Sequence, residues 1–382
     1  MFKTFVENLK IYINRQHANY LILLSYMKIF KKQFFTLICV VFCFVFSHAQ
    51  NNNIDLAIEL FHQKQYTISQ SLFHQIDSDQ ALLYNARCSK LLLADDAKDL
   101  FKRFINDFPF SSLYVEANLD LADIYYNEED YSSAINYFNI GVSQLNSSQI
   151  FKLAYSHFQI DSLETAKHFF SKLLLDESEY QSASKYYFAH IAYKSKHYQN
   201  SLKWFKQLEN DPKFKTIVPY YISQIYYFLE EYQQLVLYID PVLDNVIDSR
   251  RSEVSRLVGE SYYRLKDYYN AIKYFEIYQS SSDILSEDDY YMIAFSYYQI
   301  SDYSNAIKFF NEISLSDNIL SQLTSYYLGA SYLRLNKNNY ALQAFKNASS
   351  LEFNSFIQEE AFFNYAKLAF ELDLPFENVF LI

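Results

Sequence analysis

The sequence predicts an all-α protein built from a repeated pair of antiparallel helices, and two observations lead to this prediction. The chain holds 38 Tyr and 35 Phe but only 3 Gly and 5 Pro in 382 residues, so it has much apolar surface to bury and few helix breakers. The stretch from Gly259 to Tyr278 contains two helix-length apolar patterns separated by a short polar break, and the stretch from Ile293 to Ile313 repeats it 35 residues later. A repeated unit indicates an array that grows by stacking.

Each unit combines small residues, where two helices would come close, with large aromatic residues around them. In the second helix of the unit the small residue is Ala271, and Phe275 follows four residues later. The same small position recurs nine times along the chain with a mean spacing of 34 residues, at Ser69, Ala97, Ala134, Ala166, Ser201, Leu235, Ala271, Ala306 and Ala341.

These residues carry a resemblance to a known family. The first helix has a small residue and a tyrosine three residues later, and the second has an alanine and an aromatic residue four later: Gly259, Tyr262, Ala271 and Phe275 in one repeat, Gly329, Tyr332, Ala341 and Phe345 in another. Over about residues 54–374 the chain resembles tetratricopeptide repeat (TPR) proteins, whose period is 34 residues. The family's early tryptophan and late proline are mostly missing. The resemblance implies a right-handed superhelical solenoid of about nine helix pairs over residues 50–374.

The N-terminus predicts export. Three lysines, Lys28, Lys31 and Lys32, precede the apolar run 34–46, and Ser47-His48-Ala49 follows it, which is the order of a secretory signal peptide over residues 27–49 with cleavage after Ala49. A permanent membrane helix is the weaker interpretation, since a bilayer span needs ~20 apolar residues. Met27 stands directly before the signal, so we interpret residues 1–26 as a mis-annotated upstream extension.

The remaining chain, residues 50–382, has 27 basic and 43 acidic residues, a net charge of −16. This balance argues against nucleic acid and against anionic membrane surfaces as partners. Cys88 is the one cysteine left, so no intramolecular disulfide can form. Stability must come from packing.

Local signals predict where helices begin, where two helices pack closely and where the last helix ends. Acidic residues open several second helices and are expected to cap them, at Asp130, Glu231, Asp267 and Asp302. Gly259 and Gly329 lie inside helices, where glycine costs ~1 kcal/mol against alanine, so we expect close helix approach there. The last repeat is predicted to be incomplete, with its first helix over Glu359 to Leu372 and Ala366 at the small position. Residues 375–382 are interpreted as a truncated or irregular end.

No motif supports catalysis, a cofactor or a metal. Three glycines are too few for a phosphate-binding loop. His190 and His197 stand seven residues apart without the spacing of a zinc site, so ordinary surface histidines are favoured. The acidic run 287–289 lacks the glycine and spaced ligands of a calcium loop and indicates a helix start. The sequence therefore predicts no enzyme.

The resemblance places a binding groove on the first helices. In TPR proteins, the groove-facing positions lie three before, one after, four after and five after the small residue of the first helix. Tyrosine recurs at two of these positions and offers a large contact area with few rotatable bonds. With 38 Tyr in the chain, several would reach these positions by chance. The predicted peptide-binding residues are Tyr186, His190, Tyr193, Tyr220, Tyr227, Arg256, Glu260, Tyr263, Arg264, Tyr291, Tyr298, Tyr326 and Arg334; the same offsets also give Lys194, Gln224, Phe228, Phe295, Gln299, Ala330 and Leu333.

These features predict a non-enzymatic interaction scaffold of the bacterial cell envelope, in the periplasm or associated with the outer membrane, that binds a protein or peptide partner. Residues 101–138 are similar to the repeats of periplasmic outer-membrane-assembly and TolA-binding proteins. The alternative is a structural spacer, the N-terminal repeat module of a longer surface or outer-membrane-associated protein.

Overall fold

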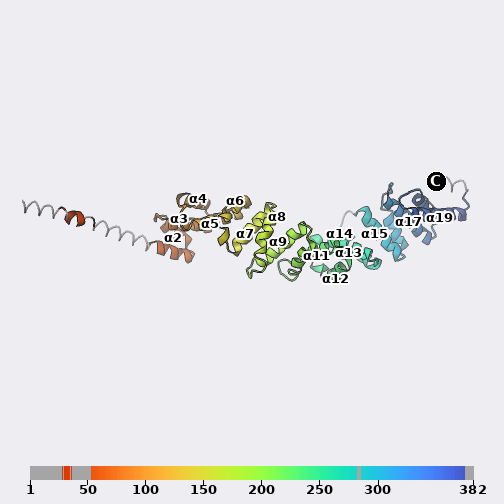
Figure 1. The fold of residues 1–382 in the computed structure, drawn as a ribbon. Helices are drawn as coiled ribbons and strands as arrows, with labels where there is room; N and C mark the ends of the chain where they lie inside the picture. The colour runs from red at the N-terminus through yellow and green to blue at the C-terminus, as the bar shows by residue number, and fades with distance from the viewer. Residues whose placement is uncertain (1–27, 29, 35, 37–52, 282–284, 375–382) are drawn as a thin grey trace, which may run out of the picture. The chain divides into compact units, whose positions relative to one another are not determined.

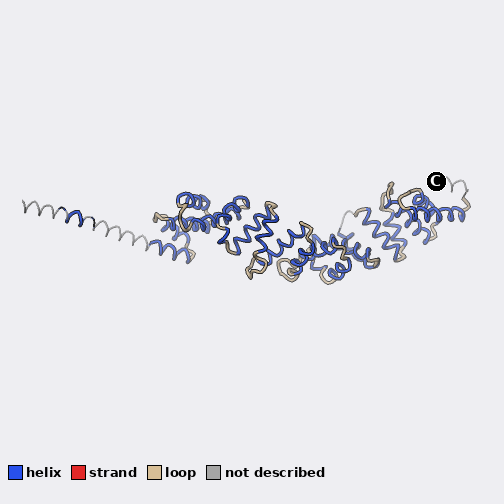
Figure 2. The backbone as a smooth tube through the Cα atoms, viewed as in Figure 1, coloured by secondary structure: helices blue, strands red, loops and turns tan. Residues whose placement is uncertain are grey.

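The computed structural model describes residues 28, 30–34, 36, 53–281 and 285–374. Every regular element in these ranges is a helix, and short loops join consecutive helices (Figures 1 and 2). The predicted all-α class with packed helix pairs is confirmed. The predicted upstream extension, most of the predicted signal peptide and the C-terminal segment 375–382 lie outside the described residues.

The chain divides into two compact units, residues 1–166 and 167–382, with the boundary inside helix α8. In the first unit, a helix over residues 53–62 precedes α2 and forms a pair with it. The helices that follow are α2 (Tyr66–Phe73), α3 (Asp79–Leu91), α4 (Ala97–Asp107), α5 (Tyr114–Asn127), α6 (Tyr131–Ile140), the short 3₁₀ helix η1 (Val142–Gln144), α7 (Ser147–Gln159) and α8 (Leu163–Ser171).

The second unit continues the alternation of first and second helices. Its first helices α11, α13, α15, α17 and α19 contact one another in succession, while each also packs on the second helix beside it. The elements are α9 (Gln181–Lys194), α10 (Tyr198–Lys206), α11 (Val218–Phe228), α12 (Tyr232–Ile239), η2 (Leu243–Asn245), α13 (Asp248–Arg264), α14 (Tyr268–Ser281), α15 (Glu287–Gln299), α16 (Tyr303–Phe310), α17 (Ile319–Arg334), α18 (Asn338–Ser349) and α19 (Ser355–Glu371).

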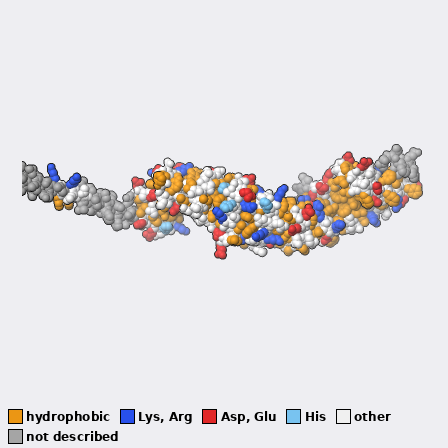
Figure 3. Space-filling model, in the orientation of Figure 1, with side chains coloured by type: hydrophobic (Ala, Val, Ile, Leu, Met, Phe, Trp, Pro, Cys, Tyr) orange, Lys and Arg blue, Asp and Glu red, His pale blue; other side chains and the backbone are white. Residues whose placement is uncertain are grey.

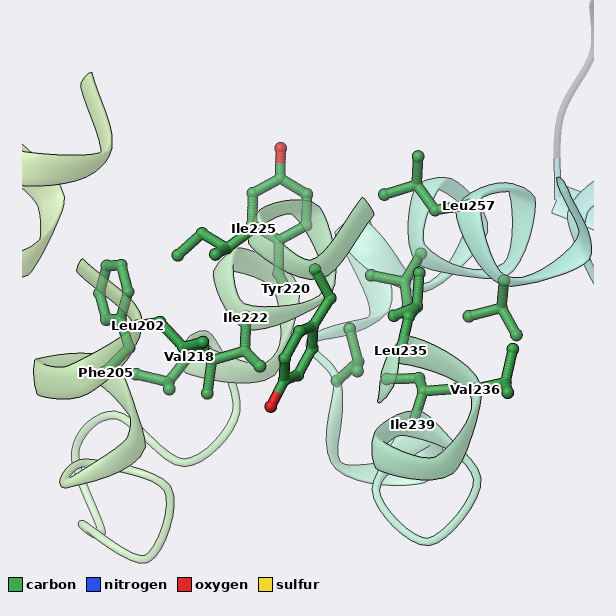
Figure 4. Close-up of a cluster of buried hydrophobic side chains, with 14 of the residues drawn as sticks. Leu202, Phe205, Val218, Tyr220, Ile222, Ile225, Leu235, Val236, Ile239 and Leu257 are labelled. Carbon is green, nitrogen blue, oxygen red and sulfur yellow. The ribbon is translucent and has the colours of Figure 1, made fainter. Parts of the chain in front are cut away.

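The core follows the small and large positions of the repeat. All nine small residues named above are buried, and so is the residue four positions after each. That second set is Phe73, Phe101, Phe138, Phe170, Phe205, Ile239, Phe275, Phe310 and Phe345. Figure 4 shows the most divergent repeat, where aliphatic side chains of α11 and α12 fill the space between Phe205 and Leu257. Aliphatic residues therefore maintain the same core where the aromatic pattern lapses.

The glycine prediction is confirmed by close helix packing. A Cβ added to Gly259 would lie 2.8 Å from Cδ1 of Phe275, and one added to Gly329 would lie 3.0 Å from Cδ1 of Phe345. Both phenylalanine rings are buried. The second helix of each pair thus rests its ring directly on the backbone of the first.

We therefore expect Gly259→Ala to destabilise the second unit. Overpacking a core costs about 1–3 kcal/mol, which exceeds the ~1 kcal/mol that alanine gains in helix propensity. The measurement is denaturant unfolding of the variant, alone and combined with Phe275→Leu. The smaller side chain should relieve the clash, so the double variant should lose less free energy of unfolding than the sum of the two single changes. Additive losses would contradict the contact.

Each helix hairpin turns through a residue with left-handed backbone, a feature that the sequence does not mark with glycine. Lys266 has φ 62°, and the following amide of Asp267 donates to the carbonyl of Tyr262 at 2.9 Å, which satisfies the end of α13. Such residues cost about 1–2 kcal/mol of backbone strain each. The set within the described residues is Lys64, Leu93, Glu129, Asp161, Lys196, Glu230, Lys266, Ser301, Asn336 and Asp373.

Three of the four predicted acidic caps are observed. The side chains of Asp130, Asp267 and Asp302 each accept a hydrogen bond from the backbone amide three residues later. The prediction for Glu231 is wrong: it precedes α12 without a side-chain cap bond, and its longer side chain instead accepts from Gln199 Nε2 at 3.3 Å.

The last predicted helix begins four residues earlier than expected, at Ser355, because Asn354 caps α19 by accepting from the Ile357 amide at 3.1 Å.

Candidate functional site

The predicted site residues lie on five successive first helices of the second unit, α9, α11, α13, α15 and α17. Eight of them are tyrosines, and we call this set the tyrosine wall. Seven of its members are partly exposed, while Tyr220 is buried with only 9% of its surface exposed. The wall consists of Tyr186, Tyr193, Tyr220, Tyr227, Tyr263, Tyr291, Tyr298 and Tyr326.

Contacts between neighbouring first helices hold the wall in place. The hydroxyl of Tyr193 on α9 donates to Oε1 of Gln224 on α11. Farther along, the ring of Tyr263 on α13 lies 5.8 Å from that of Phe295 on α15, centroid to centroid. In both contacts, the residue four positions after the small residue of one first helix meets the residue one position after the small residue of the next first helix. The repeat therefore places Tyr193 and Tyr263 in equivalent positions, each in contact with the next first helix.

The wall begins in an aromatic cluster on α9. Tyr186 stacks on Phe214 with ring centroids 4.8 Å apart, and its ring also contacts those of His190 and Tyr221. Burial, together with the positive charge of Lys194, lowers the pKa of His190. His190 is thus a member of an aromatic cluster, whereas His197 is exposed at the start of α10. The part of the chain that the structure describes contains no group of three or more His, Cys, Asp or Glu placed to hold a metal ion.

The charged residues predicted on α13 neutralise one another. Oε1 of Glu260 accepts from Nη2 of Arg264 at 2.7 Å, while Nη1 of Arg256 lies 3.5 Å from Oε2 of the same carboxylate. Arg256 also lies 3.7 Å from Oδ1 of Asp289. Both acidic side chains are buried, at 7% and 5% exposure. The α13 charge cluster, formed by Arg256, Glu260, Arg264 and Asp289, has no net charge and offers mainly Arg264 to a ligand.

The first unit carries a different set of side chains on its first helices, which the sequence analysis missed. Nε of Arg87 on α3 lies 2.6 Å from Oδ2 of Asp120 on α5, and Nζ of Lys152 on α7 lies 2.6 Å from Oδ1 of Asp123. Lys90 bridges the two aspartates at 2.9 and 3.3 Å. Arg87 and Asp123 each directly follow a small residue, so the repeat offset could have found them. These ion pairs lie beside aromatic contacts of the same kind as in the second unit, since the rings of Tyr126 on α5 and Tyr155 on α7 lie 6.0 Å apart.

Burial gives the tyrosine wall a measurable signature in alkali. It raises the pKa of Tyr193, Tyr227 and Tyr263 each to about 12, against about 10 for an exposed tyrosine. Because the folded pKa values are the higher ones, the unfolded chain releases protons first. The stabilisation is therefore complete below pH ~10 and is lost as pH rises toward ~12.

We expect the second unit to unfold cooperatively between pH ~10 and ~12. The tyrosinate absorbance should increase over the same pH interval in which the helical circular dichroism signal is lost. Tyr227→Phe should shift the midpoint to higher pH, while the same change at Tyr269, which is 74% exposed, should leave it in place. Full ionisation of the tyrosines before any loss of helix would contradict the burial of the wall.

No described helix combines the length and apolarity required to cross a membrane. Cys88 is buried and forms no disulfide.

No protein-family model matches the chain, and no curated protein matches it. Among solved structures, the Naa15/Naa10 complex bound to HypK is 14% identical over 84% of this chain and 51% of the other, with a TM-score of 0.48. The chain thus spans about half the length of that match.

Two smaller structures are also similar. A tetratricopeptide repeat protein from Parabacteroides merdae is 14% identical over 66% of this chain and 98% of its own, with a TM-score of 0.38. YrrB, a TPR protein with an unusual peptide-binding site, is 15% identical over 53% of this chain and 92% of its own, also with a TM-score of 0.38. Tetratricopeptide repeat proteins recur among the solved structures that are similar to this chain, at 14–15% identity and with TM-scores of 0.26–0.39.

Proposed function

We propose that the chain is a non-enzymatic protein–protein interaction scaffold that binds a peptide or protein segment along the tyrosine wall of its second unit. One observation carries the proposal: five consecutive first helices present partly exposed tyrosines at matching positions of the repeat. A regular row of similar side chains suits an extended or helical segment, which offers repeated contacts along its length.

The wall is suited to binding because its rings are already ordered. Tyrosine and phenylalanine have few rotatable bonds, and their inter-helix contacts remove much of the freedom that binding would otherwise cost. Phe228 is 48% exposed, and its ring stacks on Tyr198 at 5.4 Å. Arg334, on α17 with Tyr326, is also exposed. These two side chains can contact a partner directly, while Tyr220 and Glu260 support the surface from below.

The location belongs to the proposal as well. The predicted signal peptide over residues 27–49 supports export, and the similarity of residues 101–138 to periplasmic repeat proteins supports the envelope as the site of action. A spacer module of a longer surface protein would share both features but would not need a binding face. The test must therefore ask whether this face binds.

The decisive experiment compares two variants, each with two exposed side chains replaced. Phe228→Ser with Arg334→Ala removes exposed side chains at the wall, while Tyr269→Ser with Tyr340→Ser removes rings that are 74% and 65% exposed on second helices. We expect the wall variant to lose proteins that co-purify with the native chain from envelope extracts, and the control to retain them. Equal retention by both variants would refute the proposed face. Matching thermal unfolding curves would show that both variants remain folded.

A further inference from the structure

The last described helix, α19, presents an exposed row of phenylalanines. Phe356, Phe363 and Phe370 are spaced seven residues apart, so they lie on one face of the helix, and they are 67%, 66% and 76% exposed. We call them the phenylalanine stripe. Figure 3 shows hydrophobic side chains gathered on the visible face of the C-terminal helices. Aligned exposed rings of this size mark an interaction surface more often than isolated ones do.

The repeat explains why these rings are exposed. Phe363 and Phe370 lie three before and four after the small residue Ala366, as Tyr291 and Tyr298 do around Ala294. The ring of Tyr298 is covered by Tyr327 of the next first helix, with centroids 5.2 Å apart. No first helix follows α19 within the described residues. The phenylalanine stripe thus occupies a position that the next first helix covers in the repeat of α15.

Charge indicates which helix could cover it. Glu360 and Lys367 flank the stripe on the same side of α19, seven residues apart with Phe363 near their midpoint, and neither forms an ion pair within the described residues. If a second α19 lies antiparallel to the first with Phe363 at the two-fold axis, the side of the stripe that carries Glu360 and Lys367 faces the same side of the other copy. Glu360 of each copy then meets Lys367 of the other. A parallel pair would bring neither charge opposite its complement.

We propose that the chain self-associates through the phenylalanine stripe, with two α19 helices packed antiparallel about Phe363. In this arrangement Phe363 meets its own copy, Phe356 meets Phe370, and two Glu360–Lys367 pairs close the same edge. The contact is isologous, since the same patch serves both copies, so it closes as a dimer and does not propagate. This proposal does not depend on the tyrosine wall.

The test measures the mass of the purified full chain by sedimentation over a wide range of concentration. We expect the native chain to pass from one-chain to two-chain mass as concentration rises, and Phe363→Asp to stay at one-chain mass. Phe110→Asp is the matched control, because Phe110 is 99% exposed on the first unit, and it should dimerise as the native chain does. Unchanged circular dichroism of both variants would show that the fold is intact.

A charge exchange tests the orientation. Lys367→Glu should weaken dimerisation, because it turns each Glu360–Lys367 pair into a pair of like charges, and adding Glu360→Lys should restore it. Restoration fails if the helices are parallel. A native chain of one-chain mass at all concentrations would overturn the proposal, as would a dimer that survives Phe363→Asp or one lost equally in Phe110→Asp. If only a chain ending at Leu374 dimerises, the stripe is covered by the chain's own residues 375–382, which also overturns it.

Discussion

Replacing Phe275 by alanine should lower the free energy of unfolding of the second unit by about 3–5 kcal/mol, the usual cost of removing a buried ring. The ring is fully buried and lies against the backbone of Gly259. Gly259 has no side chain that could fill the space. The loss combines the transfer free energy of the ring with the cavity that remains.

Denaturant unfolding followed by circular dichroism measures this loss. Tyr269→Ala is the matched control, since Tyr269 lies on the same helix α14 and is 74% exposed, and it should change stability by less than about 0.5 kcal/mol. Hydrogen exchange should locate the damage first in α13 and α14, because each helix pair depends mainly on its neighbours. Similar losses in the two variants would contradict the role of Phe275 as the centre of the repeat.

The second large effect is expected from the α13 charge cluster. Replacing both Arg256 and Arg264 by glutamine leaves the carboxylate of Glu260 buried without a counter-charge. Removing the partners of a buried charge costs about 3–5 kcal/mol, far more than an exposed ion pair contributes. We expect the variant to lose stability by an amount in this range.

A matched pair of arginines on the same helix provides the control. Arg250 and Arg251 form ion pairs with Glu253 and Asp248 at 3.3 Å, and their side chains are 51% and 37% exposed. Their replacement by glutamine should cost less than about 1 kcal/mol. Restoring the first variant by Glu260→Gln would identify the unpaired carboxylate as the cause. Equal losses from the two arginine pairs would show that burial of Glu260 does not govern the energy.

The packing of the repeat could be predicted from the sequence, because it depends on the sizes of the side chains. Gly259 and Phe275 are 16 residues apart in one helix pair, so a local pattern of small and large residues is enough to place them together. The hairpin turns were not readable in the same way. Lys266 and its equivalents are left-handed without being glycine. The amides of Lys266 and Asp267 donate to the carbonyls of Tyr263 and Tyr262, and these hydrogen bonds compensate for the strain.

The sequence predicted only in part which side chains the first helices expose. The repeat offsets identify which residues face the neighbouring first helix, but whether a side chain stays exposed depends on a helix about 35 residues away. The ring of Tyr298 is covered by Tyr327 of the next first helix, and Tyr220 is buried in a core cluster that includes residues of α13. The charge pairs of the first unit could not be predicted in this way, because the repeat pattern specifies small and aromatic positions and not which positions carry charge.

The proposed scaffold is tested most directly by placing a photo-crosslinking amino acid at Phe228, next to Tyr227 of the tyrosine wall, and, as the comparison, at Tyr269 on α14. Both side chains are exposed, so both substitutions should leave the fold intact. After irradiation of native cells, we predict discrete crosslinked products from position 228 that are missing from position 269. Crosslinks of equal pattern at both positions, or none at position 228, would contradict a partner bound along the wall.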